Sequence, residues 1–356
     1  MSTPTSLSAP ADAAISTGRP VRLGLVGSGW IGAFHAQSVA LRIPGAVLAA
    51  VADPVPGAAE KVAAPLGVDT IYLHAADLFA SPDVDGVIIS SPAFTHTDLV
   101  VAAAEAGKAV FVEKPMALTL EDADRAIAAA QNAGVPLQVG FNRRYATDFA
   151  AAGRLVHSGK VGTPQLLRSL TRDPGLANPG AIKPWTIFNE TLIHDFDTLN
   201  WFNAGATPVE VVALADALVA PDYKDKGLLD TAVVTIRYDN GAIATAEANF
   251  SASYGYDVRG EIFGSKGMIT AGDVRSTSMR FYGADGEAAE TTRLNIDLFH
   301  QAYTDELVAF VDAIRTGEVA GAAGEDARAA LVVALAARAS IERGAVVRIN
   351  QDGSLA

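Results

Sequence analysis

The sequence contains no cysteine among its 356 residues, which excludes disulfides, thiolate nucleophiles and cysteine-ligated zinc. Long apolar runs are also missing. The longest lies between Ala329 and Ala337 and ends at Arg338, whereas a membrane span needs roughly 18 uninterrupted apolar residues. Histidine motifs that bind metals, such as H-x-H and H-E-x-x-H, do not occur. We therefore expect neither a membrane partner nor a bound metal.

Positive charge is scarce, because 27 lysines and arginines stand against 40 acidic residues and the net charge is −13. Such a balance argues against nucleic acid and anionic membranes as partners and favours a neutral small molecule. Residues 1–20 lack the positive start and apolar centre of a signal peptide. We expect a flexible tail there and a cytoplasmic location.

With 356 residues, the chain is longer than a domain with a single hydrophobic core usually is. A hydrophobic fraction of 50% provides enough apolar surface for two cores. The pattern of the sequence changes near residue 140. It predicts two domains after the tail: a dinucleotide-binding domain over residues 21–140, and a substrate-binding and oligomerisation domain over residues 141–356.

A glycine-rich turn follows the first apolar run, which covers residues 21–26. Gly27, Gly29 and Gly32 form the pattern G-x-G-x-x-G at the start of a helical stretch. The first glycine permits a tight turn, the second lets a pyrophosphate approach the backbone, and the third allows close helix–strand packing. We assign these glycines to a dinucleotide site, together with Trp30 and Ile31 between them. The alternative is a glycine turn in some other strand–helix unit.

An acidic residue in the right place supports this assignment. Asp53 ends the second apolar run, about 20 residues after Gly32, where a carboxylate would bind the ribose 2′-hydroxyl and repel a 2′-phosphate. Pro54 and Val55 follow it, so no arginine is present there to accept such a phosphate. The sequence therefore predicts NAD rather than NADP as the cofactor.

Apolar runs and helical stretches continue to alternate up to residue 140, which predicts a doubly wound parallel sheet of the Rossmann type. Ligands of such sheets collect at the carboxyl ends of the strands. One run, residues 84–90, leads into a loop, and another, residues 109–112, leads into Glu113-Lys114-Pro115. We predict cofactor contacts at these ends, from Ser91, Pro92, His96, Glu113 and Lys114. The alternative for Lys114 is a solvated loop lysine.

Beyond residue 200 the apolar pattern is that of strands. Six runs between residues 209 and 282, the last at 278–282, alternate or follow one another without intervening helices, and helical patterns return at 302–316 and 325–343. This order predicts a mostly antiparallel open sheet with helices on one face. The other face would then be apolar, which favours a homo-oligomer, either a dimer or a tetramer, through this sheet. The predicted fold class is α/β followed by α+β.

A helix over residues 189–202 is the segment with the most chemistry. At helical spacing Leu192, Phe196, Leu199 and Phe202 form an apolar stripe, and the opposite side carries Glu190, His194 and Asp197, with Asn189 as the helix cap. A carboxylate one turn before a histidine can orient the ring and stabilise its charged form, as a general base requires. The alternative is a solvated polar face.

These motifs occur together in one order: the glycine turn, Glu113-Lys114-Pro115, the run from Gly140 to Tyr145, and the Glu190…His194 helix. In this the chain resembles the Gfo/Idh/MocA oxidoreductases, from about Val21 to about Thr316. Within that family it looks most like the NAD-dependent inositol 2-dehydrogenases. The resemblance also covers Thr191 and the turn that contains Asp173.

The resemblance implies that a cyclic polyol, myo- or scyllo-inositol, is oxidised to the ketone with NAD. It gives Lys114 the role of the catalytic lysine and His194 that of the base. Glu190 stands where inositol dehydrogenases typically have aspartate, and Asn142 where several relatives have methionine. Together with the catalytic residues, the expected substrate contacts come from Asn142, Arg143, Asp173, Thr191 and Tyr256, with Asp257 as a further hydroxyl binder. The alternative for Arg143, Asp173, Tyr256 and Asp257 is a structural salt bridge or turn.

The chemistry of the residues agrees with this role. A neutral His194 would take the hydroxyl proton, Glu190 would stabilise the resulting imidazolium, and Lys114 would stabilise developing negative charge on oxygen. The runner-up hypothesis is an NAD-dependent pyranose or glycoside dehydrogenase of the same family. Two other classes remain open: an NAD-dependent glycosidase that retains its cofactor, and a non-catalytic sugar sensor.

Overall fold

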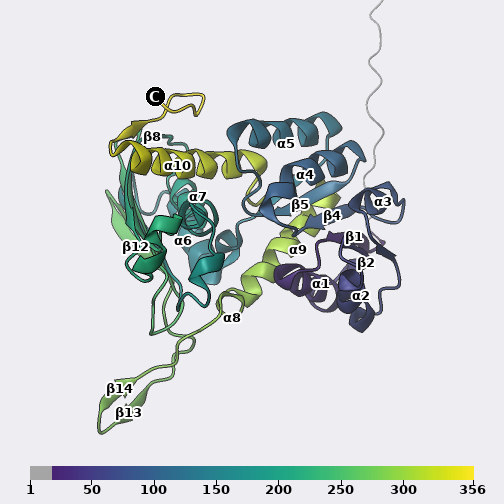
Figure 1. The fold of residues 1–356 in the computed structure, drawn as a ribbon, viewed down its shortest axis with the longest axis horizontal. Helices are drawn as coiled ribbons and strands as arrows, with labels where there is room; N and C mark the ends of the chain where they lie inside the picture. The colour runs from purple at the N-terminus through teal and green to yellow at the C-terminus, as the bar shows by residue number, and fades with distance from the viewer. Residues whose placement is uncertain (1–17) are drawn as a thin grey trace, which may run out of the picture.

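The computed structural model describes residues 18–356 (Figure 1). Most of the tail predicted for residues 1–20 lies outside the described residues. Arg19 belongs to the described part, and its guanidinium donates to both carboxylate oxygens of Asp85, at 2.7 and 2.8 Å. The chain is therefore held against the first domain before its first strand begins. No helix within residues 18–356 has the length and apolar character needed to cross a membrane.

The first sheet has six parallel strands in the order β3-β2-β1-β4-β5-β6. The strands are β1 Val21–Val26, β2 Ala46–Ala52, β3 Ile71–Tyr72, β4 Gly86–Ile89, β5 Ala109–Glu113 and β6 Leu137–Gly140. Every residue of β4 and β5 is buried, as expected for central strands covered on both faces. The order reverses between β1 and β4, which creates a crevice at their carboxyl ends. The prediction of a doubly wound parallel sheet is confirmed.

Helices cover both faces of this sheet, and one of them comes from the far end of the chain. The local helices are α1 Trp30–Arg42, α2 Ala58–Ala63, α3 Ala75–Ala80, α4 His96–Glu105 and α5 Leu120–Ala133, with 3-10 turns at Ala64–Leu66 and Ala93–Thr95. Helix α9, His300–Thr316, adds Leu307, Phe310 and Val311 to the core formed by β1, β2 and α1. The core of the first domain therefore contains residues from beyond position 300 (Figure 1).

The second sheet has seven strands in the order β12-β11-β7-β10-β9-β8-β15. They are β7 Pro164–Arg172, β8 Pro208–Asp216, β9 Thr231–Tyr238, β10 Ile243–Asn249, β11 Asp257–Gly264, β12 Gly267–Ala271 and β15 Val347–Arg348. All neighbours are antiparallel except β7 and β10. The predicted antiparallel character is thus confirmed.

Helices α6 Thr147–His157, α7 Ile193–Phe202 and α10 Gly324–Arg343 pack on one face of this sheet. Figure 1 shows α10 lying across the top of the second domain towards α5. The opposite face keeps large apolar side chains in solvent, among them Leu166, Leu214, Val233 and Phe263. The burial pattern of β9 alternates along the strand, because successive side chains point to opposite faces.

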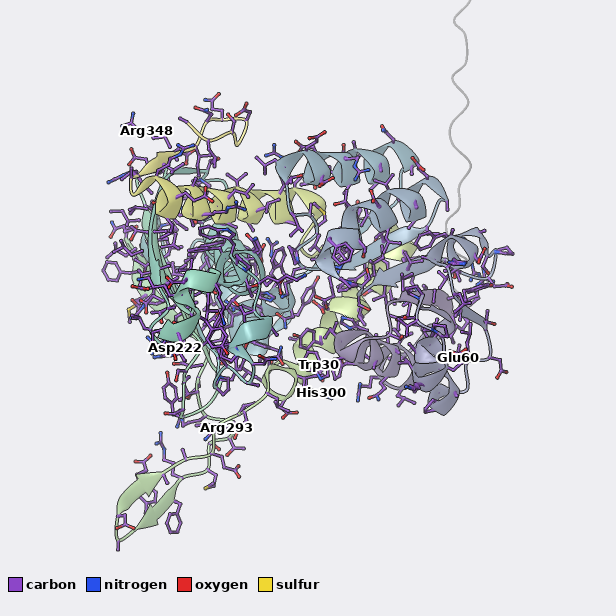
Figure 2. All side chains as sticks on the ribbon, viewed as in Figure 1. Trp30, Glu60, Asp222, Arg293, His300 and Arg348 are labelled. Carbon is purple, nitrogen blue, oxygen red and sulfur yellow. The ribbon has the colours of Figure 1, made fainter. Side chains whose placement is uncertain are left out.

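One predicted strand forms a separate arm. The run 278–282 was expected to extend the large sheet, but β13 Phe281–Gly283 pairs with β14 Gly286–Ala288 as a two-stranded hairpin that projects from the body (Figure 1). The arm returns at Arg293 (Figure 2), whose guanidinium donates to the Ser253 carbonyl at 2.7 Å. The short helix α8, Asn295–Leu298, then leads into α9.

The helix predicted over residues 189–202 is divided in two. Residues Ile187–Thr191 form a π turn, in which the Leu192 N–H donates to the Ile187 carbonyl at 2.8 Å, and α7 follows. Asn189 therefore lies inside the turn and does not cap the helix. Shorter 3-10 turns occur at Asn142–Tyr145, Pro179–Ala181 and Pro221–Lys226.

The apolar stripe of this helix is confirmed, since Leu192, Phe196, Leu199 and Phe202 are all fully buried. Of the polar residues, Asp195 and Asp197 of α7 are at most 1% exposed, whereas Glu190 in the preceding π turn is exposed. Helix α7 contacts α10 on one side and β7 on the other. The aspartates of α7 therefore do not belong to a solvated face.

Candidate active site

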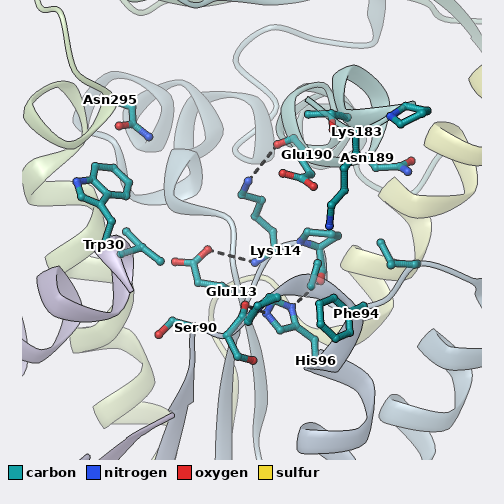
Figure 3. A pocket seen from close by; sticks show the side chains of 18 of the residues that line it. Trp30, Ser90, Phe94, His96, Glu113, Lys114, Lys183, Asn189, Glu190 and Asn295 are labelled. Carbon is teal, nitrogen blue, oxygen red and sulfur yellow. Dashed lines mark hydrogen bonds between the residues drawn. The ribbon is translucent and has the colours of Figure 1, made fainter. Parts of the chain in front are cut away.

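A cavity of about 470 Å³ opens at the carboxyl ends of β4 and β5 (Figure 3). Its walls come from the loops after these strands, from the start of α1, and from residues 183–190 of the second domain. Of the predicted cofactor residues, those that line it are Trp30, Ile31, Ser91, Pro92, His96, Glu113 and Lys114; of the predicted substrate residues, Lys114 and Glu190 line it. The cleft thus lies at the switch point where the topology places a ligand.

The glycine turn lies next to this cavity. Gly27 has φ 93°, and a Cβ there would lie 2.8 Å from the Ser91 nitrogen. A Cβ on Gly32 would lie 2.1 Å from the Gly27 carbonyl oxygen, whereas a Cβ on Gly29 would meet open space. The first and third glycines are therefore required by packing. The second leaves backbone accessible, which suits a pyrophosphate.

Asp53 is held beside this turn. Its carboxylate accepts hydrogen bonds from the Ser28 N–H at 2.8 Å, the Ser28 hydroxyl at 2.6 Å and the Val55 N–H at 2.9 Å. Partial burial opposes ionisation, but the hydrogen bonds from Ser28 and Val55 outweigh it and lower the pKa of Asp53. The carboxylate is therefore ionised and oriented at the end of β2, as recognition of a ribose would require.

Lys114 connects the two domains. It follows β5 directly, and its Nζ donates to the backbone carbonyl of Glu190 in the π turn at 3.0 Å (Figure 3). Its side chain is therefore held across the cleft, unlike that of a solvated loop lysine. The Glu190 side chain is itself exposed and reaches the cavity.

The predicted pairing of Glu190 with His194 is wrong for this structure. Within residues 18–356 no hydrogen bond joins the Glu190 carboxylate to the imidazole, because the π turn changes the register between the two positions. The His194 ring instead lies edge-on to Phe141, with centroids 5.9 Å apart, and its Nδ1 is buried without a hydrogen-bond partner among the described residues. Burial, and then the charges of Lys114 and Arg143, hold the pKa of His194 well below its usual value.

Arg143 has a structural partner. It is 3% exposed, and its guanidinium donates to Asp195 at 2.7 Å and to Thr171 at 2.6 Å. Asp195 also accepts from the hydroxyls of Ser169 and Thr171, at 2.5 and 2.7 Å. These contacts fix the start of α7 and leave Arg143 little freedom to bind substrate. Its contribution to the site is a positive charge beside His194.

Asp197 is engaged in the same way, so the prediction that it shares a polar face with Glu190 is wrong. The Arg144 guanidinium donates to both of its carboxylate oxygens, at 2.9 and 2.6 Å, and also pairs with Asp326 of α10 at 3.1 Å. This network joins the 3-10 turn at Asn142–Tyr145, α7 and α10. It holds in place the helix that carries His194.

Asp173 lies within electrostatic reach of Lys114 and Arg143, and Tyr256 lies within reach of Arg143. Burial raises the pKa of Asp173, and the Tyr256 hydroxyl and the charges of Arg143 and Lys114 offset only part of that effect. Burial, and then Asp173, raise the pKa of Tyr256 well above its usual value. The Oδ1 atom of Asp173 is buried without a partner among the described residues. The pair therefore presents an unused acceptor beside Lys114.

His96 holds two loops together. One ring nitrogen faces the Pro115 carbonyl and the other the Ser91 carbonyl, both at 2.8 Å. The ring is 1% exposed, so its main contacts are with the protein. His96 thus positions the loops after β4 and β5 around the cavity.

Three other predicted binders differ in their surroundings. Asn142 is 2% exposed and does not line the cavity, and Thr191 is the last residue of the π turn. Asp257 is fully buried, accepts from Arg259 at 2.7 and 2.9 Å and from Tyr254 at 2.7 Å, and therefore has no free acceptor for a substrate.

Several cavity residues were not found by sequence reasoning. Asn189 is one, and its Oδ1 is buried without a partner among the described residues. Lys183 is another, with its ammonium 6.0 Å from the centre of the Phe94 ring across the cleft. Asn295 of α8 is the third. Residues 183 and 189 precede a recognisable motif, but Asn295 follows the projecting arm and has no signal in the sequence.

Comparison with known proteins agrees with this geometry. Residues 21–141 match the Gfo/Idh/MocA model, described as an oxidoreductase family with an NAD-binding Rossmann fold, and residues 149–270 match the Gfo/Idh/MocA C-terminal domain. Myo-inositol 2-dehydrogenase of Thermotoga maritima is 35% identical over 93% of this chain and 99% of its own length. The NAD-dependent scyllo-inositol 2-dehydrogenase of Bacillus subtilis is 34% identical over 93% and 96%.

Solved structures show the same likeness. A probable dehydrogenase from Thermotoga maritima superposes with a TM-score of 0.88 at 35% identity, over 92% of this chain and 98% of that one. Scyllo-inositol dehydrogenase from Lactobacillus casei, with bound NAD(H) and scyllo-inositol, gives a TM-score of 0.86 at 30% identity, over 93% and 99%.

Proposed function

Because the chain belongs to the Gfo/Idh/MocA oxidoreductase family, we propose that it oxidises a ring hydroxyl of myo- or scyllo-inositol to the ketone, with NAD as hydride acceptor. The observation that carries the proposal is a set of unpaired polar atoms at the cleft between the domains. Asp173 Oδ1 and Asn189 Oδ1 are buried without partners among the described residues, and the Lys114 ammonium and the His194 ring lie nearby. A small molecule bearing several hydroxyls can satisfy such atoms, because each hydroxyl both donates and accepts.

The residues present fit NAD. Gly29 leaves open space at the turn, and Asp53 supplies a fixed, ionised acceptor at the end of β2. NAD, when bound, accepts the hydride from the carbinol carbon. The cavity loops, which His96 holds together, provide the walls for the reacting groups.

His194 takes the hydroxyl proton in this proposal. Its lowered pKa keeps the imidazole neutral at physiological pH, so the ring can accept a proton. Nδ1 is buried, which leaves Nε2 as the nitrogen that substrate can reach. Lys114 would exchange its contact with the Glu190 carbonyl for the substrate oxygen and stabilise developing alkoxide. Glu190, from its exposed position, would bind a substrate hydroxyl.

The second candidate is an NAD-dependent pyranose or glycoside dehydrogenase. It is favoured by Glu190, which is one methylene longer than the aspartate typical of inositol dehydrogenases and reaches a cavity that also contains Lys183. Such a wall could bind a ring that carries an additional substituent.

Initial rates of NADH formation test the two candidates. The panel contains myo-inositol, scyllo-inositol, glucose and a methyl glucoside, each with NAD and with NADP. We expect turnover of an inositol, and a clear preference for NAD because Asp53 disfavours a 2′-phosphate. Lys114→Met is the inactive control. Turnover of glucose or the glycoside without any inositol would favour the second candidate, and no turnover of any substrate would contradict both.

The open face of the second sheet supports a further part of the proposal, a homo-oligomer such as a tetramer or dimer. The proposal also includes a small molecule as substrate, no nucleic acid or membrane as partner, and a cytoplasmic location.

A further inference from the structure

A cluster of buried ionisable groups lies behind the cavity. His35 of α1, Glu113 at the end of β5 and Glu306 of α9 are 0%, 7% and 0% exposed. Their side-chain nitrogen and oxygen atoms approach within 4.8 Å of one another. His35 Nε2 and Glu113 Oε1 are 2.7 Å apart. We call these three residues the acid cluster.

The acid cluster has fewer hydrogen-bond partners than its groups require. Both carboxylate oxygens of Glu306 and the His35 Nδ1 have no partner among the described residues. Gln138, also fully buried, donates to the backbone carbonyl of Glu306 at 2.7 Å and not to its carboxylate. The nearby hydroxyls belong to Tyr303 and Tyr145, each under the electrostatic influence of Glu306.

Two carboxylates so close together in an apolar setting do not both ionise, because burial and mutual repulsion add. Burial, and then the charge of Glu113, raise the pKa of Glu306 well above its usual value. Glu113 is better placed than Glu306 to keep the negative charge. Its carboxylate contacts His35 and accepts a hydrogen bond from the Lys114 N–H at 3.2 Å. From these contacts we assign the shared proton to Glu306 and the negative charge to Glu113.

That charge faces the reaction site. Glu113 lines the cavity and precedes Lys114 in the chain, and Figure 3 shows its carboxylate on the Trp30 side of Lys114. In the proposed reaction the nicotinamide ring would lie beside the carbon whose oxygen Lys114 would contact. The ring is positive in NAD⁺ and neutral in NADH.

We propose that the acid cluster presents one fixed negative charge to the nicotinamide end of the cavity and so stabilises bound NAD⁺ relative to bound NADH. Glu306 and His35 are positioning residues in this account, because they act through Glu113. The inference rests on the proposed function only in taking NAD as the cofactor. The charge makes loss of hydride from bound NADH more favourable than it would be without Glu113, and so shifts the balance between polyol oxidation and ketone reduction towards reduction.

The test is the ratio of the dissociation constants of NADH and NAD⁺, measured by fluorescence and calorimetric titration without substrate. Glu113→Gln should lower this ratio about tenfold or more, as a unit charge several ångströms from the ring implies at an effective dielectric constant of about 20. Glu306→Gln replaces a neutral acid by a neutral amide of the same shape, so its ratio should stay within about twofold of the wild type. Glu113→Asp, which keeps the charge, should retain most of the preference.

An unchanged ratio in Glu113→Gln, or an equal fall in Glu306→Gln, would overturn the proposal. One equivalent of divalent metal in the purified protein would do so too, because a cation among these ligands would replace the proton and cancel the charge. If Glu113→Gln does not fold, the wild type provides the test. Its ratio of dissociation constants should not change between pH 7 and 9, and a tenfold change in that range would contradict a fixed charge. A protein that binds neither cofactor refutes the proposed function itself, whereas binding of both with an insensitive ratio refutes this inference alone.

Discussion

At the scale of single residues, His194 is distinguished by an environment that keeps its ring neutral. Burial and the charges of Lys114 and Arg143 lower its pKa well below 6.5. A base is active when unprotonated, so kcat/KM should be constant above pH 6.5 and decline only as the pH falls through this lowered pKa. His194→Ala should reduce kcat by about two to four orders of magnitude. His74→Ala, on the exposed surface, is the control. A near-normal rate in His194→Ala would remove the ring from the mechanism.

The positions of some candidate site residues could be predicted from the sequence, where they depend on local spacing. Gly27, Gly32 and Asp53 belong to this group, because the turn that they form is contained within one strand–helix–strand unit. The surroundings of the His194 ring could not be identified in this way. Helical spacing placed Glu190 beside the ring, but a single extra residue in a π turn changes which side chains meet. The buried partners Asp195 and Arg143 come together only through tertiary packing.

At the scale of elements, the π turn starts from a strained residue. Trp185 has φ 67°, the only positive φ outside glycine among the described residues. Its carbonyl accepts the N–H groups of Phe188 and Asn189, both at 3.0 Å, and Arg338 stacks on its ring at 5.0 Å. The side chain therefore holds a backbone conformation that favours glycine, directly before the residues that line the cavity.

Alanine variants are usually more stable than glycine variants, and the strain at position 185 reverses this order of stability. Both Trp185→Gly and Trp185→Ala lose the ring contacts, but only alanine keeps the unfavourable φ. The glycine variant should therefore be more stable by about 1 kcal/mol. The matched control is Ala128→Gly on the exposed side of α5, where glycine should cost about 0.5–1 kcal/mol. Urea unfolding measures both. An alanine variant as stable as the glycine variant would show that position 185 is unstrained.

Most strands and helices could be predicted because each has its own period and its own stop signals. The arm of β13 and β14 could not, because a short apolar run looks the same in a large sheet and in an isolated hairpin. The run around Phe281 has a strand pattern, and its partner at residues 286–288 has none that stands out.

At the scale of the whole molecule, the two domains share one core element and one site. Helix α9 contributes Phe310 to the first core and Glu306 to the acid cluster, while Lys114 reaches the second domain through the Glu190 carbonyl. From its position in the chain, α9 was expected to belong to the second domain. Periodicity shows which face of a helix is apolar, but it does not show which sheet that face covers. The catalytic geometry therefore depends on how the domains meet, which local patterns do not specify.

The open face of the second sheet leads to a prediction about assembly. Leu214 of β8 and Val233 of β9 are paired across neighbouring strands and are 77% and 44% exposed. Contiguous apolar surface of this kind on a sheet is typical of subunit interfaces. Light scattering after gel filtration should give a multiple of 36.8 kDa for the wild type. Leu214→Glu with Val233→Glu should shift the mass towards the monomer, because association would bury the new carboxylates without partners. Leu41→Glu, equally exposed on α1 of the first domain, should leave the mass unchanged. A monomeric wild type, or a double variant that still assembles, would show that this face is not the interface.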